Sequence, residues 1–370
     1  MNMILNCSKQ VLYDALNIVT KAIAAKPINQ ILEGVQLNAK DGLVLTGNDL
    51  DLGIECVIEA DIQEKGAVVL NARMFLDIVR RLPDADIFLQ VDENWQTTIK
   101  CKSIEYKIMG MDPAEYPAIP IIDGIGSFSI SSNTLKSMIR QTIFAVSVAN
   151  TRQVLTGSLF EVDQNTLKVV SVDGFRMAIR SELLNGQVAP LSFVVPGKTL
   201  NELLKILKDD EIEISITLTD KYVMFSFENS KIVSRLIEGE FLNYKKILPA
   251  EQKMQITLVA ADFMQCIERC EPIIAEDAAK NPIRLLVEDD MITIQCVTAT
   301  GRVFDCLPIS PTGEQLEIGF NHKYLKDALK ACETDEIVIE LNTQLSPCLI
   351  KPTEGNAFLY MVLPVRLKTE

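Results

Sequence analysis

A segment of seventeen residues recurs three times along the chain, and this repetition constrains the fold more than any other feature. The copies span 73–89, 198–214 and 323–339, and their starts lie 125 residues apart in both steps, so they align without a gap. Each copy opens with a cation, continues with apolar residues at helical spacing, passes an acidic turn and enters a β-rich run. Such a repeat predicts similar structural units in series.

A second block recurs in step with the first. Residues 43–49, 167–173 and 292–298 alternate in polarity as strands do, at offsets of 124 and 125. Upstream of each block lies a stretch with helical spacing of its apolar residues, at 8–23, 131–146 and 261–274. Each unit of roughly 120 residues therefore predicts a helix, several strands, a helix and several strands. This length exceeds the roughly 20 to 50 residues of a solenoid repeat and suffices for a domain.

We therefore predict an α+β protein with three similar domains. The expected boundaries are 1–122, 128–250 and 254–370. The expected linkers are 117–127, which contains proline and glycine, and 249–253, which begins with proline.

The composition is that of a soluble globular protein, with 48% apolar and 23% charged residues among 370. The chain contains no run of about 18 apolar residues, so we expect no membrane span. The amino terminus lacks the pattern of a signal peptide. The nine cysteines are odd in number and never form a CxxC pair, which indicates neither a disulfide framework nor a zinc site. Cys266 and Cys270 are expected to be packing residues. These features predict a cytoplasmic protein.

The net charge of −14 would ordinarily argue against a nucleic-acid partner. The distribution of charge reverses this argument. The predicted helices carry fifteen Lys and Arg against seven Asp and Glu, whereas the rest of the chain carries twenty-one against forty-three. The counted helices are 8–26, 71–82, 133–149, 198–208, 261–271 and 321–332. The predicted helices are therefore net positive, although the chain as a whole is acidic.

Cations on these helices recur at a spacing that puts them on one face. Residues seven apart are separated by two helical turns, and the pairs with this spacing are Arg73 with Arg80, Lys198 with Lys205, and Lys323 with Lys330. Lys136 and Arg140 form a further pair four residues apart. Lysines on one solvated helix face are ordinary, but recurrence in three copies favours a surface matched to the phosphate backbone. Such contacts are independent of base sequence and sensitive to salt.

Residues for catalysis are scarce. The chain has one histidine, His322, expected to be an exposed polar residue at a helix start. It contains neither a GxxxxGK[ST] loop nor a GxGxxG after a strand. The acidic pairs 209–210 and 289–290 are expected at turns. We predict a protein that is not an enzyme and needs no cofactor or metal.

Seven segments carry a resemblance that spans essentially the whole chain. They are 45–55, 69–83, 155–162, 170–179, 234–249, 316–329 and 360–367. Together they are similar to the β subunits of bacterial DNA polymerase III, the sliding clamps. The resemblance implies a DNA clamp fold, with two chains joined head to tail as a homodimer. Six domains would form a ring, with helices lining the hole and antiparallel sheets outside.

The resemblance also implies a function and partners. The ring would encircle double-stranded DNA without sequence preference and keep the replicative DNA polymerase on it as a processivity factor. Other DNA polymerases and the clamp loader would bind by short peptides in a pocket between the second and third domains, and no membrane partner is implied. The implied pocket residues are Leu155, Val172, Gly174, Phe175, Arg176, Met177, Leu242, Lys246, Ile247, Tyr324, Met361, Val362, Leu363, Pro364, Val365, Arg366 and Leu367.

This chain departs from the family pattern at the implied pocket. Phe175 stands where a histidine is common, Leu242 replaces a proline, and residues 368–370 extend past the usual terminal leucine. We therefore expect a different peptide preference. By pattern alone the carboxy-terminal run is equally typical of an edge strand.

For DNA, the resemblance supports contacts from Lys26, Arg73, Lys198, Arg152 and Gln153. At the junction between chains it places Tyr106 of one chain against Ile273 and Ile274 of the other. Two alternatives stay open: an adaptor that binds peptides without encircling DNA, and an enzyme of unknown chemistry.

Overall fold

The computed structural model describes residues 2–24, 29–149, 151–249, 251–274, 282–299 and 301–367. The chain divides into two compact units. Unit 1 comprises Met1–Asn133 and Lys205–Leu236, and unit 2 comprises Thr134–Leu204 and Ile237–Glu370. Each unit has its own sheets, all of whose strand pairs are antiparallel, so the predicted α+β class is confirmed.

Six α-helices are present in the described ranges. They are α1 (Lys9–Val19), α2 (Ala72–Arg81), α3 (Ser132–Arg140), α4 (Gly197–Ile206), α5 (Ala260–Cys270) and α6 (His322–Ala331). Five of them follow directly on a strand, and α6 follows β21 after the single residue Asn321, so the expectation that each repeat begins with a helix was incomplete. The third helix also ends earlier than its expected boundary of 149. The Thr142 hydroxyl donates to the Met138 carbonyl oxygen at 2.8 Å, which competes with helix continuation, and a 3₁₀ turn follows at Ile143–Ala145.

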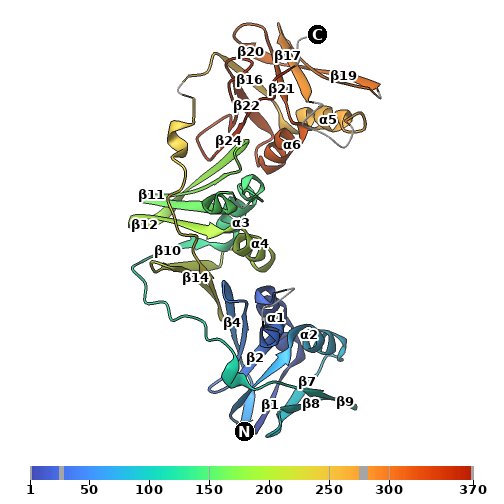
Figure 1. Ribbon diagram of the computed structural model, residues 1–370, viewed down its shortest axis with the longest axis vertical. Helices are drawn as coiled ribbons and strands as arrows, with labels where there is room; N and C mark the ends of the chain where they lie inside the picture. The colour runs from blue at the N-terminus through green and yellow to red at the C-terminus, as the bar shows by residue number, and fades with distance from the viewer. Residues whose placement is uncertain are drawn as a thin grey trace. The chain divides into compact units, whose positions relative to one another are not determined.

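Unit 1 contains a five-stranded and an eight-stranded sheet, in the orders β5-β1-β7-β8-β9 and β10-β13-β14-β15-β4-β3-β2-β6. The strands are β1 (Met3–Ser8), β2 (Gly34–Ala39), β3 (Leu43–Asn48), β4 (Leu52–Ile58), β5 (Asp61–Glu64), β6 (Gly66–Asn71), β7 (Asp86–Val91), β8 (Gln96–Cys101), β9 (Ile104–Met109), β10 (Gly126–Ser131), β13 (Glu213–Leu218), β14 (Tyr222–Phe227) and β15 (Ser230–Arg235). Helices α1 and α2 lie side by side against these strands (Figure 1).

Unit 2 contains a seven-stranded and a four-stranded sheet, in the orders β11-β12-β24-β23-β22-β16-β20 and β19-β18-β17-β21. The strands are β11 (Gly157–Val172), β12 (Arg176–Pro196), β16 (Met254–Val259), β17 (Ile283–Glu288), β18 (Met291–Thr298), β19 (Gly301–Pro308), β20 (Ser310–Thr312), β21 (Leu316–Phe320), β22 (Glu336–Leu341), β23 (Cys348–Pro352) and β24 (Phe358–Val362). Helices α5 and α6 pack against each other, as α1 and α2 do.

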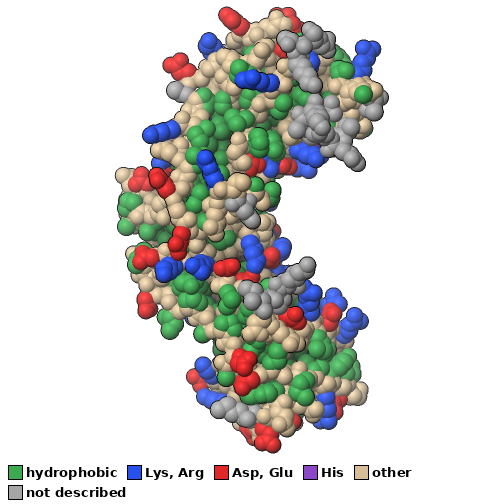
Figure 2. Space-filling model, in the orientation of Figure 1, with side chains coloured by type: hydrophobic (Ala, Val, Ile, Leu, Met, Phe, Trp, Pro, Cys, Tyr) green, Lys and Arg blue, Asp and Glu red, His purple; other side chains and the backbone are tan. Residues whose placement is uncertain are grey.

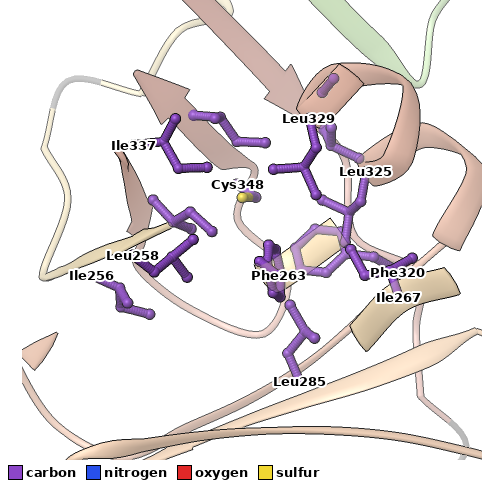
Figure 3. Close-up of a cluster of buried hydrophobic side chains, with 14 of the residues drawn as sticks. Ile256, Leu258, Phe263, Ile267, Leu285, Phe320, Leu325, Leu329, Ile337 and Cys348 are labelled. Atoms are coloured by element: carbon purple, nitrogen blue, oxygen red, sulfur yellow. The ribbon is translucent and has the colours of Figure 1, made fainter. Parts of the chain in front are cut away.

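The largest core in unit 2 lies between these helices and the sheets. Phe263 and Ile267 from α5 meet Leu325 and Leu329 from α6, and Phe320 joins them from β21 (Figure 3). All are at most 3% exposed. Since each fully buried side chain of this size contributes about 1.5–3 kcal/mol, this core accounts for much of the stability of the helix pair.

His322 is buried at 4% exposure, which contradicts the expectation of an exposed residue. The side chain of Asn321 caps α6 by accepting from the Lys323 amide, so His322 is the first helical residue. In the repeat it aligns with Ala72 of α2, which is fully buried. The register of the repeat therefore places residue 322 in the column that faces the core.

Consecutive repeats are joined by antiparallel strand pairing at two places. At the first seam, which we define as the pair β4–β15, Ile54 lies opposite Ile232. At the second seam, the pair β12–β24, Ala178 lies opposite Tyr360. Both seams satisfy the backbone groups of strands that would otherwise form sheet edges. Strands β9 and β19 each end a sheet.

Candidate nucleic-acid interface and peptide groove

The repeated cations lie on the outward faces of α2, α4 and α6. Arg73, Lys198 and Lys323 each occupy the second residue of their helix, and all are exposed. Their partners seven residues later, Arg80, Lys205 and Lys330, are exposed as well. The opposite faces are buried, as Phe75 and Leu325 show at 0% exposure. On the face drawn in Figure 2, Lys and Arg side chains of unit 1 gather beside α2.

Some of these cations are offset by carboxylates. Arg80 pairs with Asp77 on its own helix at 2.6 Å. Arg140 at the end of α3 pairs with Glu333 at 2.5 Å. Both of these cations therefore already have an anionic partner within the chain.

The remaining candidate DNA residues lie on two other segments. Lys136 lies on α3. Arg152 and Gln153 are exposed at the start of the 3₁₀ turn Gln153–Thr156. Lys26 lies outside the described residues.

An apolar cluster, which we call the groove cluster, lies at the second seam. It collects side chains from the β11–β12 hairpin, from β23 and β24, and from the segment 237–248. Its buried members are Leu155, Leu159, Val170, Val172, Met177, Ile179, Val194, Tyr244, Leu349 and Met361. Partly buried members around them are Val154, Ile237, Phe241, Leu242, Leu248, Leu359 and Leu363. Partly exposed apolar side chains over a packed floor are typical of a surface that binds a peptide.

A tight turn between β11 and β12 shapes one end of this cluster. The Asp173 carboxylate accepts hydrogen bonds from the Phe175 and Arg176 amides, at 2.9 and 3.1 Å. Gly174 has a φ of +94°, which favours glycine there. The turn presents Phe175 at 59% exposure, and its carbonyl accepts from the Leu363 amide at 2.9 Å.

Arg176 fixes the aromatic side chains next to this turn. Its guanidinium pairs with Asp173 at 2.8 Å and with Asp327 of α6 at 2.5 Å. It also lies over the Tyr324 ring at 4.6 Å, and Tyr324 stacks on Phe175 with ring centroids 5.9 Å apart. The Arg176 and Asp173 side chains are only 12% and 13% exposed, so this pair is shielded from water, whereas Asp327 is 40% exposed.

The structure brings many, but not all, of the implied pocket residues together. Six belong to the groove cluster: Leu155, Val172, Met177, Leu242, Met361 and Leu363. Gly174, Phe175, Arg176 and Tyr324 lie at its end, as described above. Lys246 and Ile247 are exposed at and after the 3₁₀ turn Tyr244–Lys246.

The carboxy-terminal residues divide between two environments. Val362 belongs to the large core of unit 2, since alternate residues of a strand face opposite ways. Past β24 the chain runs through Pro364 and Arg366, and the Val365 amide donates to the Gly319 carbonyl oxygen at 2.8 Å. An ideal Cβ on Gly319 would come within 2.5 Å of Leu367, so this glycine permits the close approach of the terminal segment.

Sequence reasoning missed Phe241, Tyr244 and Leu248, which also belong to the groove cluster. The Tyr244 hydroxyl donates to Glu161 at 2.7 Å, and Lys245 donates to the same carboxylate at 3.0 Å. Burial raises the pKa of Glu161, but these two donors outweigh it and hold that pKa below its ordinary value. The available signal was the concentration of aromatic and apolar residues in 241–248, directly before the expected linker at 249–253.

The residues implied at a junction between chains lie on and near two edge strands. Tyr106 on β9 is 36% exposed, between Ile104 at 37% and Met109 at 64%. Ile273 and Ile274 follow α5 and are half-buried. On β19, Phe304 is 70% exposed. Both edges therefore offer apolar side chains beside unpaired backbone.

The described ranges contain no group of His, Cys, Asp and Glu residues arranged to hold a metal ion. Cys266 and Cys270 are buried, as expected of packing residues, and burial raises the pKa of their thiols to about 11 and about 12. Among the described helices, none is long and apolar enough to cross a membrane.

Three family models match the chain in succession. They are the N-terminal, central and C-terminal domains of the DNA polymerase III beta subunit, over residues 3–120, 129–243 and 245–366. A Beta sliding clamp of Staphylococcus aureus is 33% identical over 362 residues, covering 95% of this chain and 96% of the relative. A Beta sliding clamp of Halalkalibacterium halodurans is 33% identical with the same coverage.

Solved structures of similar proteins agree. The DNA polymerase sliding clamp of Bacillus subtilis has a TM-score of 0.96 and 31% identity, covering all of both chains. A DnaN sliding clamp of Pseudomonas aeruginosa, bound to griselimycin, has a TM-score of 0.93 and 25% identity, covering 99% of this chain and 100% of that one.

Proposed function

The chain belongs to the DNA polymerase III beta subunit family, and from this premise we propose which of its surfaces perform each part of the function. It is a sliding clamp, a processivity factor without a catalytic role, built from three clamp domains. The proposed domain boundaries remain 1–122, 128–250 and 254–370. The observation that carries the proposal is the repeated seam. Two strand junctions, β4–β15 and β12–β24, lie within the chain, and the edge strands β9 and β19 are available for a third junction of the same kind.

The third junction forms between two chains, which makes the protein a homodimer. The repeat predicts its register. Ile54 of β4 aligns with Ala178 and then with Val303, at the offsets of 124 and 125 found in the sequence. Ile232 follows the tight β14–β15 hairpin as Tyr106 follows the β8–β9 hairpin, with closing pairs Phe227–Ser230 and Cys101–Ile104.

Tyr106 of one chain therefore lies opposite Val303 of the second chain in an antiparallel β9–β19 pair. Two such junctions close a ring of six domains. Pairing of this kind buries the exposed Tyr106 beside Ile273 and Ile274 and satisfies two edges at once. Closed twofold symmetry limits the assembly to a dimer.

The helices that carry the repeated cations line the hole and contact phosphates of duplex DNA. The DNA residues are those named above: Lys26, Arg73, Arg80, Lys136, Arg140, Arg152, Gln153, Lys198, Lys205, Lys323 and Lys330. Contacts with phosphate give no sequence preference, so the ring slides. An acidic exterior disfavours DNA outside the ring.

The groove cluster binds short peptides of DNA polymerases and of the clamp loader. Its apolar floor takes aliphatic anchors, and the Phe175–Tyr324 pair forms a wall that lacks a titratable histidine. A processivity factor acts where the chromosome is copied, so the compartment is the cytoplasm.

The test uses the protein, its clamp loader and nicked circular DNA. The purified chain is expected to sediment as a dimer, to stay on the circle after loading, and to leave when the circle is cut. A monomer, or retention unchanged by cutting, would contradict the ring. Charge reversal at Arg73 and Lys323 should reduce loading, whereas a peptide adaptor would be unaffected.

A further inference from the structure

Glu333 lies next to one of the cations proposed to contact DNA. It follows α6 by two residues, and its Oε1 atom accepts from two side chains of α3. Arg140 Nη2 donates at 2.5 Å and Ser137 Oγ donates at 2.7 Å. Ser137 in turn accepts from Gln141 Nε2 at 2.7 Å. The carboxylate is therefore held against α3 by a small polar network.

This contact offsets charge without burying it. The Arg140 side chain is 60% exposed and that of Glu333 is 41% exposed. Burial raises the pKa of Glu333, but hydrogen bonds from Ser137, Arg140 and Gln141 lower it below the ordinary value, so the group is ionised at neutral pH. An ion pair as exposed as this one contributes little free energy, because water screens both charges. A phosphate can compete with the carboxylate for the same guanidinium.

We propose that Glu333 is a built-in competitor of DNA phosphate for Arg140, and that it limits how tightly the clamp holds the duplex. The proposal rests on the DNA contact assigned to Arg140 in the proposed function. Off DNA, Arg140 donates to Glu333. When a phosphate comes near, Arg140 exchanges one anion for the other, and the net gain from that contact is small. Weak individual contacts suit a ring held on DNA by topology.

The test measures binding of the full-length protein to a short fluorescent duplex across a series of salt concentrations, by fluorescence anisotropy. Glu333→Gln should bind roughly two- to fivefold more tightly at low salt, the range set by an exposed ion pair. The slope of log affinity against log salt should also steepen, by at most the roughly 0.9 expected for one phosphate contact, because DNA no longer has to displace a carboxylate from Arg140.

Two controls separate this effect from a general change in charge. Glu336→Gln removes the same charge three residues away, at an exposed position for which no ion pair is found within the described ranges, and should leave the salt slope unchanged. In an Arg140→Gln background, Glu333→Gln should lose its effect on the slope. Ser137→Ala, which removes only one donor to Glu333, should shift affinity in the same direction by less, and it serves if Glu333→Gln does not fold.

The outcomes are distinct. If Glu333→Gln behaves like Glu336→Gln, or keeps its full effect without Arg140, the proposal is wrong while the clamp function stands. If the wild-type protein shows no salt-dependent binding to duplex DNA, the assigned DNA surface is wrong, and the proposal fails with it.

Discussion

The two seams within the chain have the same backbone pairing and different outer surfaces. At the first seam, Gly53 lies opposite Val233 and Glu55 lies opposite Lys231. At the second seam, the corresponding pairs are Met177 with Met361 and Ile179 with Leu359. Both seams therefore have the same backbone hydrogen bonding, but small and charged residues at the first seam are replaced by large apolar residues at the second.

The segments that run beside the two seams, 117–127 and 237–248, also differ. At the first seam Ile119 lies so close to Gly53 that an added Cβ would come within 2.8 Å of it, and a cavity of about 230 Å³ remains beside it. At the second seam the segment 237–248 contributes Ile237, Phe241, Leu242, Tyr244 and Leu248 to the groove cluster. Strand pairing therefore joins the repeats at both seams, whereas the side chains on one face give only the second seam the apolar surface that the proposed peptide groove requires.

The largest expected effect concerns the third junction, which the comparison predicts but the single chain leaves open. Lys107→Cys combined with Arg302→Cys places two thiols opposite each other if Tyr106 faces Val303 of the second chain. With the exposed Cys306 changed to serine, oxidation should convert nearly all of the protein to covalent dimers on a non-reducing gel. Lys107→Cys with Val297→Cys lies outside that register and is the matched control. Equal cross-linking of both pairs would contradict the register.

A second prediction makes the second seam resemble the first. Met177 is fully buried in the groove cluster, so Met177→Ala should lower the free energy of unfolding by about 2–5 kcal/mol through loss of contacts and a new cavity. Binding of a peptide from a DNA polymerase should weaken at least tenfold in a calorimetric titration. Met224→Ala, on β14 next to the first seam, is the control and should leave peptide binding unchanged. A Met177→Ala protein with normal peptide affinity would show that the groove lies elsewhere.

A third prediction tests how the first linker is seated. Gly53→Ala places a methyl group against Ile119, and the expected loss of stability in chemical denaturation is about 1–3 kcal/mol. Because the cause is a single contact, Ile119→Ala should relieve it, so the double variant should be more stable than the sum of the two single changes predicts. Strict additivity would mean that Ile119 moves aside freely.

Much of the fold followed from the sequence because repetition is a strong signal. The helices, the strand class and the register of Arg73, Lys198 and Lys323 depend on patterns present in triplicate. His322 was misjudged because a polar residue type outweighed its place in the repeat, where the aligned Ala72 is buried. Helix α3 was drawn too long because apolar spacing continues past the point where Thr142 interrupts the hydrogen bonds.

The site could be predicted less completely, for a physical reason. Arg140 pairs with Glu333 and Arg176 pairs with Asp327, across separations of 193 and 151 positions, and local patterns do not encode such partners. The roles of Leu155, Met177 and Met361 were inferred from resemblance. Their clustering became visible only when β12 and β24 were seen to pair.

The smallest expected effect concerns how the segment 237–248 is held at the second seam. Glu161 accepts from Tyr244 and Lys245, and its pKa is lowered in the folded protein. A lowered pKa stabilises the fold at pH values above that of the unfolded carboxyl, near 4.3, and this stabilisation is lost as the pH falls through the folded value. Glu161→Gln should therefore cost less than about 1 kcal/mol at pH 7, because the pair is partly exposed, and the difference from wild type should shrink toward pH 3. Denaturant unfolding at several pH values measures this difference in the free energy of unfolding. Glu240 is an exposed residue of the same segment, and the effect of Glu240→Gln on stability should not depend on pH. If the stability difference between Glu161→Gln and the wild type stays constant with pH, packing of Tyr244, and not the charge on Glu161, holds the segment 237–248 at the second seam.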